Sequence, residues 1–367
     1  MTPEFMKKYP ALIASGVVML CTWPFANLRI MRPGGDEKVY VSQALEMLGR
    51  GDWFVQTLAQ EPNYYKGPLH YLFLIFGTRL FGLQNIATVY MNFLLVGLAV
   101  VVLVKFYQKV QGDADHSIWL GVTFGLCAGV LPFTFSSQME AELIALYAIA
   151  IPALFYSRQS HKAEWLFWLV AGIAGLTKSP LHAVLLGLGG YLYWAATGSL
   201  IQRLTTWRSL LPLAGGITAC CAGFLPAFLY DMDNFLNTYV VRETLSKSAN
   251  RHSWYRALVP VFSYNLFPWI LPSLAALGLG IWRFGKLNST TKSLLLTVLC
   301  LAAPTAVFFA IHPYRSSVYC VPLMGPLLVG VTLCLQASLE HHRQLFRYLF
   351  GASVMVFAIA LAVLLAL

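Results

Sequence analysis

The chain has 367 residues, of which 58% are hydrophobic and only 11% charged, and its mean hydropathy is +0.66. A soluble globular protein does not need so large an apolar share, so the composition predicts an all-α polytopic integral membrane protein. The net charge of +10 does not indicate nucleic-acid binding, because the Lys and Arg residues lie mostly in short breaks between apolar runs, as the positive-inside rule expects.

The apolar runs predict about eleven transmembrane helices in one domain over residues 1–367, with no C-terminal soluble domain. We expect these helices at residues 11–30, 85–106, 117–136, 141–157, 163–178, 180–197, 209–230, 259–282, 293–311, 316–336 and 347–367. Every second break is rich in basic residues, which places those breaks in the cytoplasm. The first loop, 32–84, and the second large loop, 231–258, then face the outside. For a bacterial chain this means the inner membrane, with the polar loops in the periplasm.

The first outer loop is the longest polar interruption near the start of the chain. It begins with the adjacent acids Asp36 and Glu37, which precede a predicted amphipathic helix over 37–48. We expect the apolar face of that helix to carry Tyr40, Ala44, Leu45 and Leu48. Residues 68–81 are apolar but too short to cross a bilayer, which favours a re-entrant or surface helix.

Asp36 and Glu37 are candidate catalytic residues, because a carboxylate at the mouth of a membrane cavity can act as general base on an acceptor hydroxyl. The alternative is an acid pair that only favours the helix dipole. The turn that follows supplies candidate substrate-binding residues, namely Tyr64, Tyr65, Lys66 and His70.

A second pair of acids, Glu140 and Glu142, lies where one apolar run ends and the next begins. An acid at this depth is costly unless solvated or paired, so both are further catalytic candidates. The alternative is a solvent-facing helix cap with Ser136 and Ser137. Lys178 precedes Pro180 at a helix end and could hold a phosphate, or else snorkel to lipid headgroups.

The remaining candidates lie in the later outer segments, where basic and aromatic residues mix. They suit anionic lipid headgroups or a phosphoglycan, and the substrate-binding candidates among them are Arg251, His252, Tyr255, Arg315 and Tyr319. Glu243 and His252 leave a divalent metal open, although a lone His without a second at ligand spacing is more often an ordinary polar residue. The seven cysteines show neither metal nor disulfide spacing.

Several of these segments together resemble the GT-C glycosyltransferases of the protein O-mannosyltransferase and lipid A aminoarabinose transferase type. The first-loop match is the run GDEKVYVSQALEMLGRGDWFV followed by YYKGPLHYLF. The supporting matches are GLTKSP, the segment from FLPAFLYDMDNFLNTYVV to SWYRALVPVFSYNLFPWILP, and HPYRSSVYCVPL. The resemblance covers roughly residues 11 to 340.

This resemblance implies a GT-C fold and a polyprenyl-phosphate sugar donor. Asp36 takes the place of the catalytic acid, Lys66 that of a lysine near the lipid phosphate, and Lys178 and Tyr319 match positions lining the donor cavity. Glu140 or Glu142 takes the second acidic position. Two departures stand out: Tyr65 replaces a Glu that can help to bind a metal, and Gly67 stands where Pro is usual.

The predicted function is transfer of a sugar from a polyprenyl-phosphate donor to lipid A, another envelope glycan or a protein, with inversion and with Asp36 as general base. A lipid-linked sugar flippase or other transporter is the alternative, but it should carry polar residues near the bilayer midplane on broken helices. A structural membrane subunit is a third reading, in which Asp36 and Lys66 would tolerate substitution.

Overall fold

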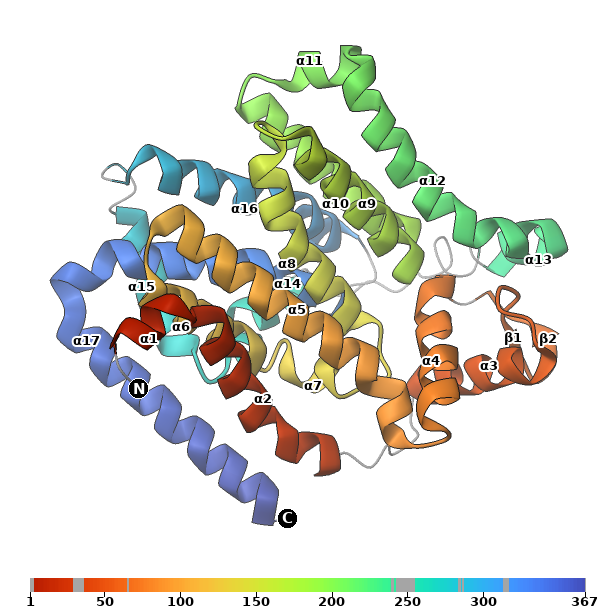
Figure 1. Cartoon of the computed structure of the whole chain (residues 1–367), viewed down its shortest axis with the longest axis horizontal. Coiled ribbons are helices and arrows are strands. Elements are labelled where there is room, and N and C mark those ends of the chain that lie inside the picture. The colour runs from red at the N-terminus through yellow and green to blue at the C-terminus, as the bar shows by residue number, and fades with distance from the viewer. Residues whose placement is uncertain are drawn as a thin grey trace.

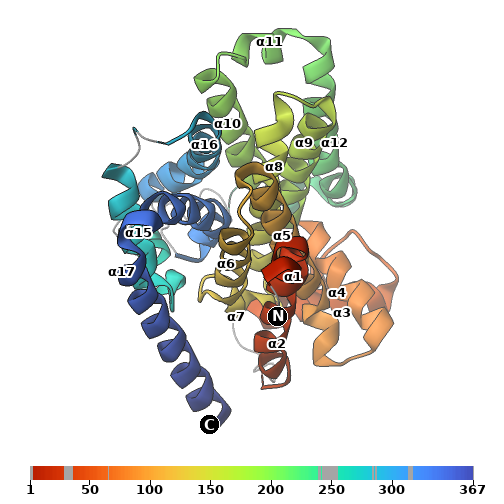
Figure 2. The same cartoon turned by 60° about the vertical axis from the view of Figure 1, so that its left-hand side comes forward.

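The computed structural model describes residues 3–28, 36–64, 66–238, 241, 255–282, 285, 287–312 and 317–366. They form a bundle of helices with one small hairpin, shown in two views in Figures 1 and 2. The predicted all-α class is thereby confirmed.

The elements are α1 (Pro3–Lys8), α2 (Pro10–Leu28), α3 (Asp36–Arg50), β1 (Thr57–Leu58), β2 (Glu61–Pro62), α4 (Pro68–Phe81), α5 (Asn85–Gln111), α6 (Ala114–Leu126), α7 (Leu131–Thr134), α8 (Glu140–Ser157), α9 (His161–Thr177), α10 (Pro180–Ala196), α11 (Leu200–Thr205), α12 (Trp207–Tyr230), α13 (Met232–Phe235), α14 (Tyr255–Phe262), η3 (Tyr264–Leu266), α15 (Ile270–Trp282), α16 (Ser289–Ile311), η5 (Ser317–Leu323) and α17 (Met324–Ala366).

The length and apolarity of the helices fit a membrane protein. Within the described ranges, five helices are long and apolar enough to cross a bilayer: Ile86–Gln111, Glu140–Ser157, Trp207–Tyr230, Ser289–Ile311 and Val318–Ser338. Shorter apolar helices cover Pro10–Thr22, Ile270–Gly280 and Gln344–Ile359. These helices fall on predicted spans, so the regular alternation of apolar runs located them correctly.

Two predicted spans are not continuous helices. The run 117–136 is interrupted between α6 and α7, and the run 259–282 is interrupted around η3. The two breaks face one another: the Ala128 amide donates to the Phe267 carbonyl at 2.8 Å, and the Gly129 amide donates to the Asn265 carbonyl at 2.8 Å. Non-helical backbone at membrane depth is tolerated where protein satisfies its polar groups, and each break does this for the other.

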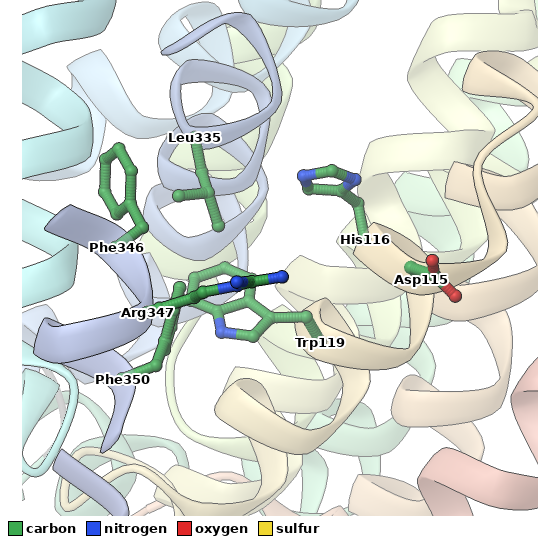
Figure 3. Close-up of a pocket in the computed structure, with 7 residues that line it drawn as sticks. All are labelled: Asp115, His116, Trp119, Leu335, Phe346, Arg347 and Phe350. Carbon is green, nitrogen blue, oxygen red and sulfur yellow. The ribbon is translucent and has the colours of Figure 1, made fainter. Parts of the chain in front are cut away.

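The C-terminal element α17 contains most of the two predicted spans 316–336 and 347–367. They are two helical segments that meet at a kink at His342, where the backbone is not helical (φ −127°, ψ 29°). Beyond the kink its C-terminal half extends away from the bundle (Figure 1). A cavity of about 350 Å³ lies between α6 and α17, and the residues that line it include His116 and Trp119 of α6 and Phe346 and Arg347 of α17 (Figure 3).

The first outer loop folds as a unit of α3, the hairpin and α4 at one end of the molecule (Figure 1). The buried face of α3 carries Tyr40, Gln43, Ala44 and Met47. Leu45 is exposed and Leu48 only partly buried, so the predicted face was wrong at Leu45. The true face is centred on the positions 40, 43, 44 and 47, which share one side of a helix with 3.6 residues per turn.

Polar contacts of α3 hold the hairpin and α4 against it. The Glu46 carboxylate accepts from the amides of Ala59 and Gln60 at 2.7 and 3.1 Å, and these two residues have positive φ. Gln43 donates to the Asn63 carbonyl at 2.8 Å and accepts from the Tyr71 hydroxyl at 2.9 Å. The loop that carries Lys66 is therefore fixed to α3 on one side and to α4 on the other.

The pairing of the two breaks predicts slow amide exchange at non-helical positions. In hydrogen–deuterium exchange by mass spectrometry, a peptide that contains Ala128 and Gly129 should exchange as slowly as the flanking part of α6, because both amides are hydrogen-bonded inside the protein. The exposed turn at residues 82–84, which joins α4 to α5 and whose amides donate no described hydrogen bond, is the fast-exchanging reference. Exchange at 128–129 as fast as at that turn would contradict the pairing.

Candidate functional site

The candidate site forms around the start of α8. The Asn92 side-chain amide, from α5, donates to the carbonyls of Ser136 and Gln138 at 2.8 Å each. An amide nitrogen carries two hydrogens, so a single side chain satisfies two carbonyls of the loop that enters α8. This loop sets the direction in which the first residues of α8 present their carboxylates.

Glu140 and Lys178 form a buried ion pair. The Lys178 Nζ lies 2.5 Å from Glu140 Oε1, and each residue is only 5% exposed. Lys178 follows α9 directly, and Pro180 starts α10, so the ammonium is presented from the short break between two helices. The Lys178 Nζ also lies 4.5 Å from the centroid of the Tyr319 ring, as a cation–π contact requires.

Two alternatives from the sequence are thereby excluded. Glu140 is not a solvent-facing cap, and Lys178 does not snorkel to the headgroups, because each is buried against the other. Two opposite charges can both be buried in this way because each compensates the other for its lost hydration.

Glu142 is buried as well, and its partner is His70 of α4. Glu142 Oε1 lies 2.6 Å from His70 Nδ1, while His70 Nε2 lies 2.9 Å from the Ser137 carbonyl oxygen. A carbonyl only accepts, so Nε2 carries a hydrogen, and Nδ1 and Glu142 then share a single proton. Glu142 Oε2 has no hydrogen-bond partner among the residues that the structure describes.

The turn with Lys66 lies directly on the Lys178 backbone. The Gly67 amide donates to the Lys178 carbonyl at 3.1 Å, and Lys66 itself is buried. A Cβ at position 67 would lie 2.1 Å from the Leu176 carbonyl oxygen, so only glycine fits this approach. Gly67 stands where the sequences that this chain resembles usually have Pro. It allows the backbone of the turn that carries Lys66 to pack against the backbone at Lys178.

Asp36 is connected to this cluster through Tyr40. The Tyr40 ring lies 5.4 Å from the His70 ring, centroid to centroid and edge to face. Asp36 is the first residue of α3 and lies one turn before Tyr40, roughly 6 Å along the helix axis. Asp36 is exposed and Glu37 partly buried, so of the two acids Asp36 is the more open to a substrate from solution.

Tyr64 lies at the other edge of the same loop. Its ring packs edge-on against Phe235 with centroids 5.5 Å apart, and within the described ranges its buried hydroxyl has no hydrogen-bond partner. Burial, with Asp231 nearby, raises the pKa of Tyr64 to about 12. The hydroxyl therefore keeps its proton near neutral pH and can donate a hydrogen bond but cannot act as a base.

Not every predicted residue belongs to this cluster. Tyr255 begins α14 and is exposed. The other predicted residues lie outside the described part of the chain, namely Tyr65, Glu243, Arg251, His252 and Arg315. Among the described residues, no three His, Cys, Asp or Glu side chains gather as a metal site.

Some supporting residues escaped the sequence-based search. Asn92 and Gln43 position the loops on either side of the cluster but have no charge to draw attention to them. A signal was present in each case, since a polar residue within an apolar run or on the apolar face of a helix requires a buried partner.

Comparison with known proteins supports the fold. No protein-family model and no curated protein matches the chain by sequence. Among solved structures, the chain is similar to that of ArnT from Cupriavidus metallidurans bound to undecaprenyl phosphate, with a TM-score of 0.71 and 18% identity over 89% of this chain and 60% of that one. It is also similar to ArnT from Cupriavidus metallidurans in the apo state, with a TM-score of 0.67 and 19% identity over 83% of this chain and 55% of that one. The chain thus spans less than two thirds of these proteins, and the likeness confirms the predicted GT-C fold.

The ion pair predicts a strongly non-additive double-mutant cycle. Lys178→Met should lower the free energy of unfolding by about 3–5 kcal/mol, because it leaves the Glu140 charge buried alone. Glu140→Leu should cost a similar amount, and the double variant much less than the sum. Unfolding by SDS titration in mild detergent measures all three, with Lys162→Met as the exposed lysine control. Additive costs would show that the two groups do not interact.

The close approach at Gly67 predicts a steric penalty. Gly67→Ala should destabilise the protein, because the new Cβ collides with backbone, which cannot move aside as a side chain can. The matched control is Gly49→Ala in α3, where a Cβ meets nothing within 4 Å and alanine favours the helix. Thermal unfolding of both variants should separate them. An unfolding temperature of Gly67→Ala equal to or higher than that of the wild type would refute the contact.

Proposed function

We propose that this chain is a membrane glycosyltransferase that moves a sugar from a polyprenyl-phosphate carrier to an acceptor hydroxyl on the outer face of the bacterial inner membrane. The observation that carries the proposal is the meeting of the Lys66 turn with Lys178, beside the buried acids at the start of α8. The fold shared with ArnT, one of whose structures contains undecaprenyl phosphate, supports this class of carrier. Lipid A, another envelope glycan and a protein all remain acceptor candidates.

In the proposed reaction, the acceptor oxygen attacks the anomeric carbon while the bond from that carbon to the phosphate oxygen breaks. The polyprenyl phosphate leaves with the electron pair, and the Asp36 carboxylate takes the proton of the acceptor hydroxyl. Direct displacement inverts the anomeric centre. The step balances, since a proton is transferred to Asp36 and no electron is gained or lost.

The cationic groups would stabilise the charge of the departing phosphate. Lys66 and Lys178 are both buried, and ammonium groups shielded from water interact with an anion more strongly than exposed ones do. An ammonium has three N–H groups, so the bond from Lys178 to Glu140 does not by itself prevent contact with a phosphate. Glu140 and Tyr319 hold the Lys178 ammonium in place, which reduces the reorganisation needed when the phosphate leaves.

Glu142 and His70 have a supporting role in this proposal. They are buried and share a proton with one another, so they are not exposed to an acceptor from solution. Their contact joins α4 to α8, and the Tyr40 ring lies against His70. The dyad thus positions α3, and with it Asp36, relative to the lysines.

The proposal predicts separate effects of Asp36 and Lys66 on chemistry and on binding. Asp36→Asn should lower turnover by about 10²–10⁴-fold, because general-base help is lost, while leaving the affinity for undecaprenyl phosphate unchanged. Lys66→Met should weaken that affinity. Release of undecaprenyl phosphate from a panel of undecaprenyl-phosphate pentoses and hexoses measures turnover, and native mass spectrometry measures binding.

Glu61→Gln, an exposed acid of the same loop, is the matched control, and Glu37→Gln tests which of the adjacent acids is the base. Wild-type turnover by a folded Asp36→Asn protein would rule out the assigned base. Transport of the lipid-linked sugar without release of lipid phosphate would replace the transferase with a flippase.

A further inference from the structure

A basic cavity lies at the opposite end of α8 from the candidate site. It has a volume of about 230 Å³ and opens between the turn that follows α8, the start of α9, and the segment that joins α11 to α12. Glu140 and Ser157 are the two ends of α8, so roughly 27 Å of helix separates the cavity from the buried acids. That distance is close to the thickness of the hydrocarbon layer, which places the cavity at the other membrane face.

One arginine of this cavity is part of the framework. Arg203 pairs with the buried Glu164 and donates to the Ser157 carbonyl at 2.9 Å. Its guanidinium also lies 5.7 Å from the centroid of the Trp194 ring. Arg203 and Glu164 therefore neutralise each other and fix the wall of the cavity.

Two further arginines line the same cavity. Arg158 and Arg208 are exposed, and in the described part of the chain neither side chain has a hydrogen bond or an ion pair. Among the described residues, Glu164 is the only carboxylate that lines the cavity, and Arg203 already pairs with it. The cavity consequently carries two positive charges that no acid of its lining balances.

The backbone adds to this positive potential. The 17-residue helix α9 begins at His161 and the 24-residue helix α12 begins at Trp207, both at the cavity. The Ser160 side chain caps α9 by accepting from the Ala163 amide, whereas Thr206, the cap residue of α12, makes no side-chain hydrogen bond to the first turn. Uncapped amides at a helix start favour an anion, and here they accompany the arginine side chains.

An apolar surface adjoins the cavity and indicates the kind of anion. Ile201 is 78% exposed, Leu204 49% and Trp207 72%, and they recur every three residues from α11 to the first residue of α12. The intervening residues Gln202 and Arg203 line the cavity. A free phosphate would make no contact with this exposed apolar stripe, whereas the acyl chains of a lipid would pack against it. Trp is also typical of the membrane interface.

We propose that this cavity is a binding site for the phosphodiester headgroup of an anionic phospholipid, with phosphatidylglycerol as the representative ligand. Arg158 and Arg208 bind the phosphate, and the acyl chains lie along Ile201, Leu204 and Trp207. The basic breaks that border the cavity belong to the face that the positive-inside rule assigns to the cytoplasm, where the leaflet is rich in anionic lipid. The site is independent of the proposed transferase activity.

Native mass spectrometry of the intact protein in detergent tests this site. The wild type should retain one phosphatidylglycerol more tightly than phosphatidylcholine. The Arg158→Ala/Arg208→Ala variant should lose about tenfold or more in phosphatidylglycerol affinity, since each basic group near an anionic lipid surface contributes appreciably. Both side chains are exposed, so the variant should keep the wild-type unfolding temperature.

The matched control is Lys105→Ala/Lys162→Ala, which removes two exposed charges from the same predicted face outside the cavity. It should bind phosphatidylglycerol as the wild type does, and Arg158→Lys/Arg208→Lys should retain most of the affinity. An equal loss in the control pair would show diffuse attraction and overturn the site. Displacement of the lipid by equimolar inorganic phosphate would show a free-anion pocket instead. The comparison of the two lipids can be made on the wild-type protein alone. Equal binding of phosphatidylglycerol and phosphatidylcholine would also overturn the proposal.

Discussion

The buried ion pair between Glu140 and Lys178 is the constraint on which the rest of the site depends. Removing either charge from water costs several kcal/mol, and the opposite charge at 2.5 Å offsets much of that cost. The pair thereby fixes the start of α8 against the break between α9 and α10. Through the Gly67 amide, the same break receives the turn that carries Lys66. The proposed site for a lipid phosphate depends on this arrangement, in which Glu140 holds the Lys178 ammonium and the Gly67 amide holds the turn of Lys66 against the Lys178 backbone.

The other acid of α8 extends this frame to the outer loop. Glu142 binds His70, the Tyr40 ring lies against His70, and Asp36 begins the helix that carries Tyr40. The supports of this chain of contacts are neutral side chains such as Asn92 and Gln43, which donate to loop carbonyls, and Gln43 also accepts from the Tyr71 hydroxyl. The exposed acid and the buried lysines therefore belong to one connected structure, although Asp36 lies on an outer-loop helix and Lys178 lies between two apolar helices. Rigid positioning of this kind is what the proposed direct displacement requires.

Much of this architecture could be predicted from the sequence, and the failures have physical causes. Apolar runs located the helices because lipid demands them, and the isolated acids and lysines stood out because charge is rare here. The pairing of Glu140 with Lys178 and of Glu142 with His70 could not be predicted, since the partners lie 38 and 72 residues apart in sequence. The break at 127–130 is as apolar as the helix beside it, so composition concealed it. The break around η3 contains Ser263, Asn265 and Pro268, but its hydrogen-bonded partner becomes visible only when the two breaks are brought together. The apolar character of Leu45 predicted the wrong side of α3 for it, because the buried face includes the polar Gln43 and leaves Leu45 exposed.

The two faces of the molecule carry different chemistry, with acids and lysines at one end of α8 and arginines at the other. At the first of these ends, we propose, Lys66 and Lys178 together hold the phosphate of the carrier lipid within reach of Asp36. An experimental structure with undecaprenyl phosphate bound tests it most directly. The account predicts density for the phosphate in contact with both ammonium groups, on the side from which Asp36 is accessible. A phosphate bound away from both lysines, with Asp36 separated from it by packed protein, would contradict the account.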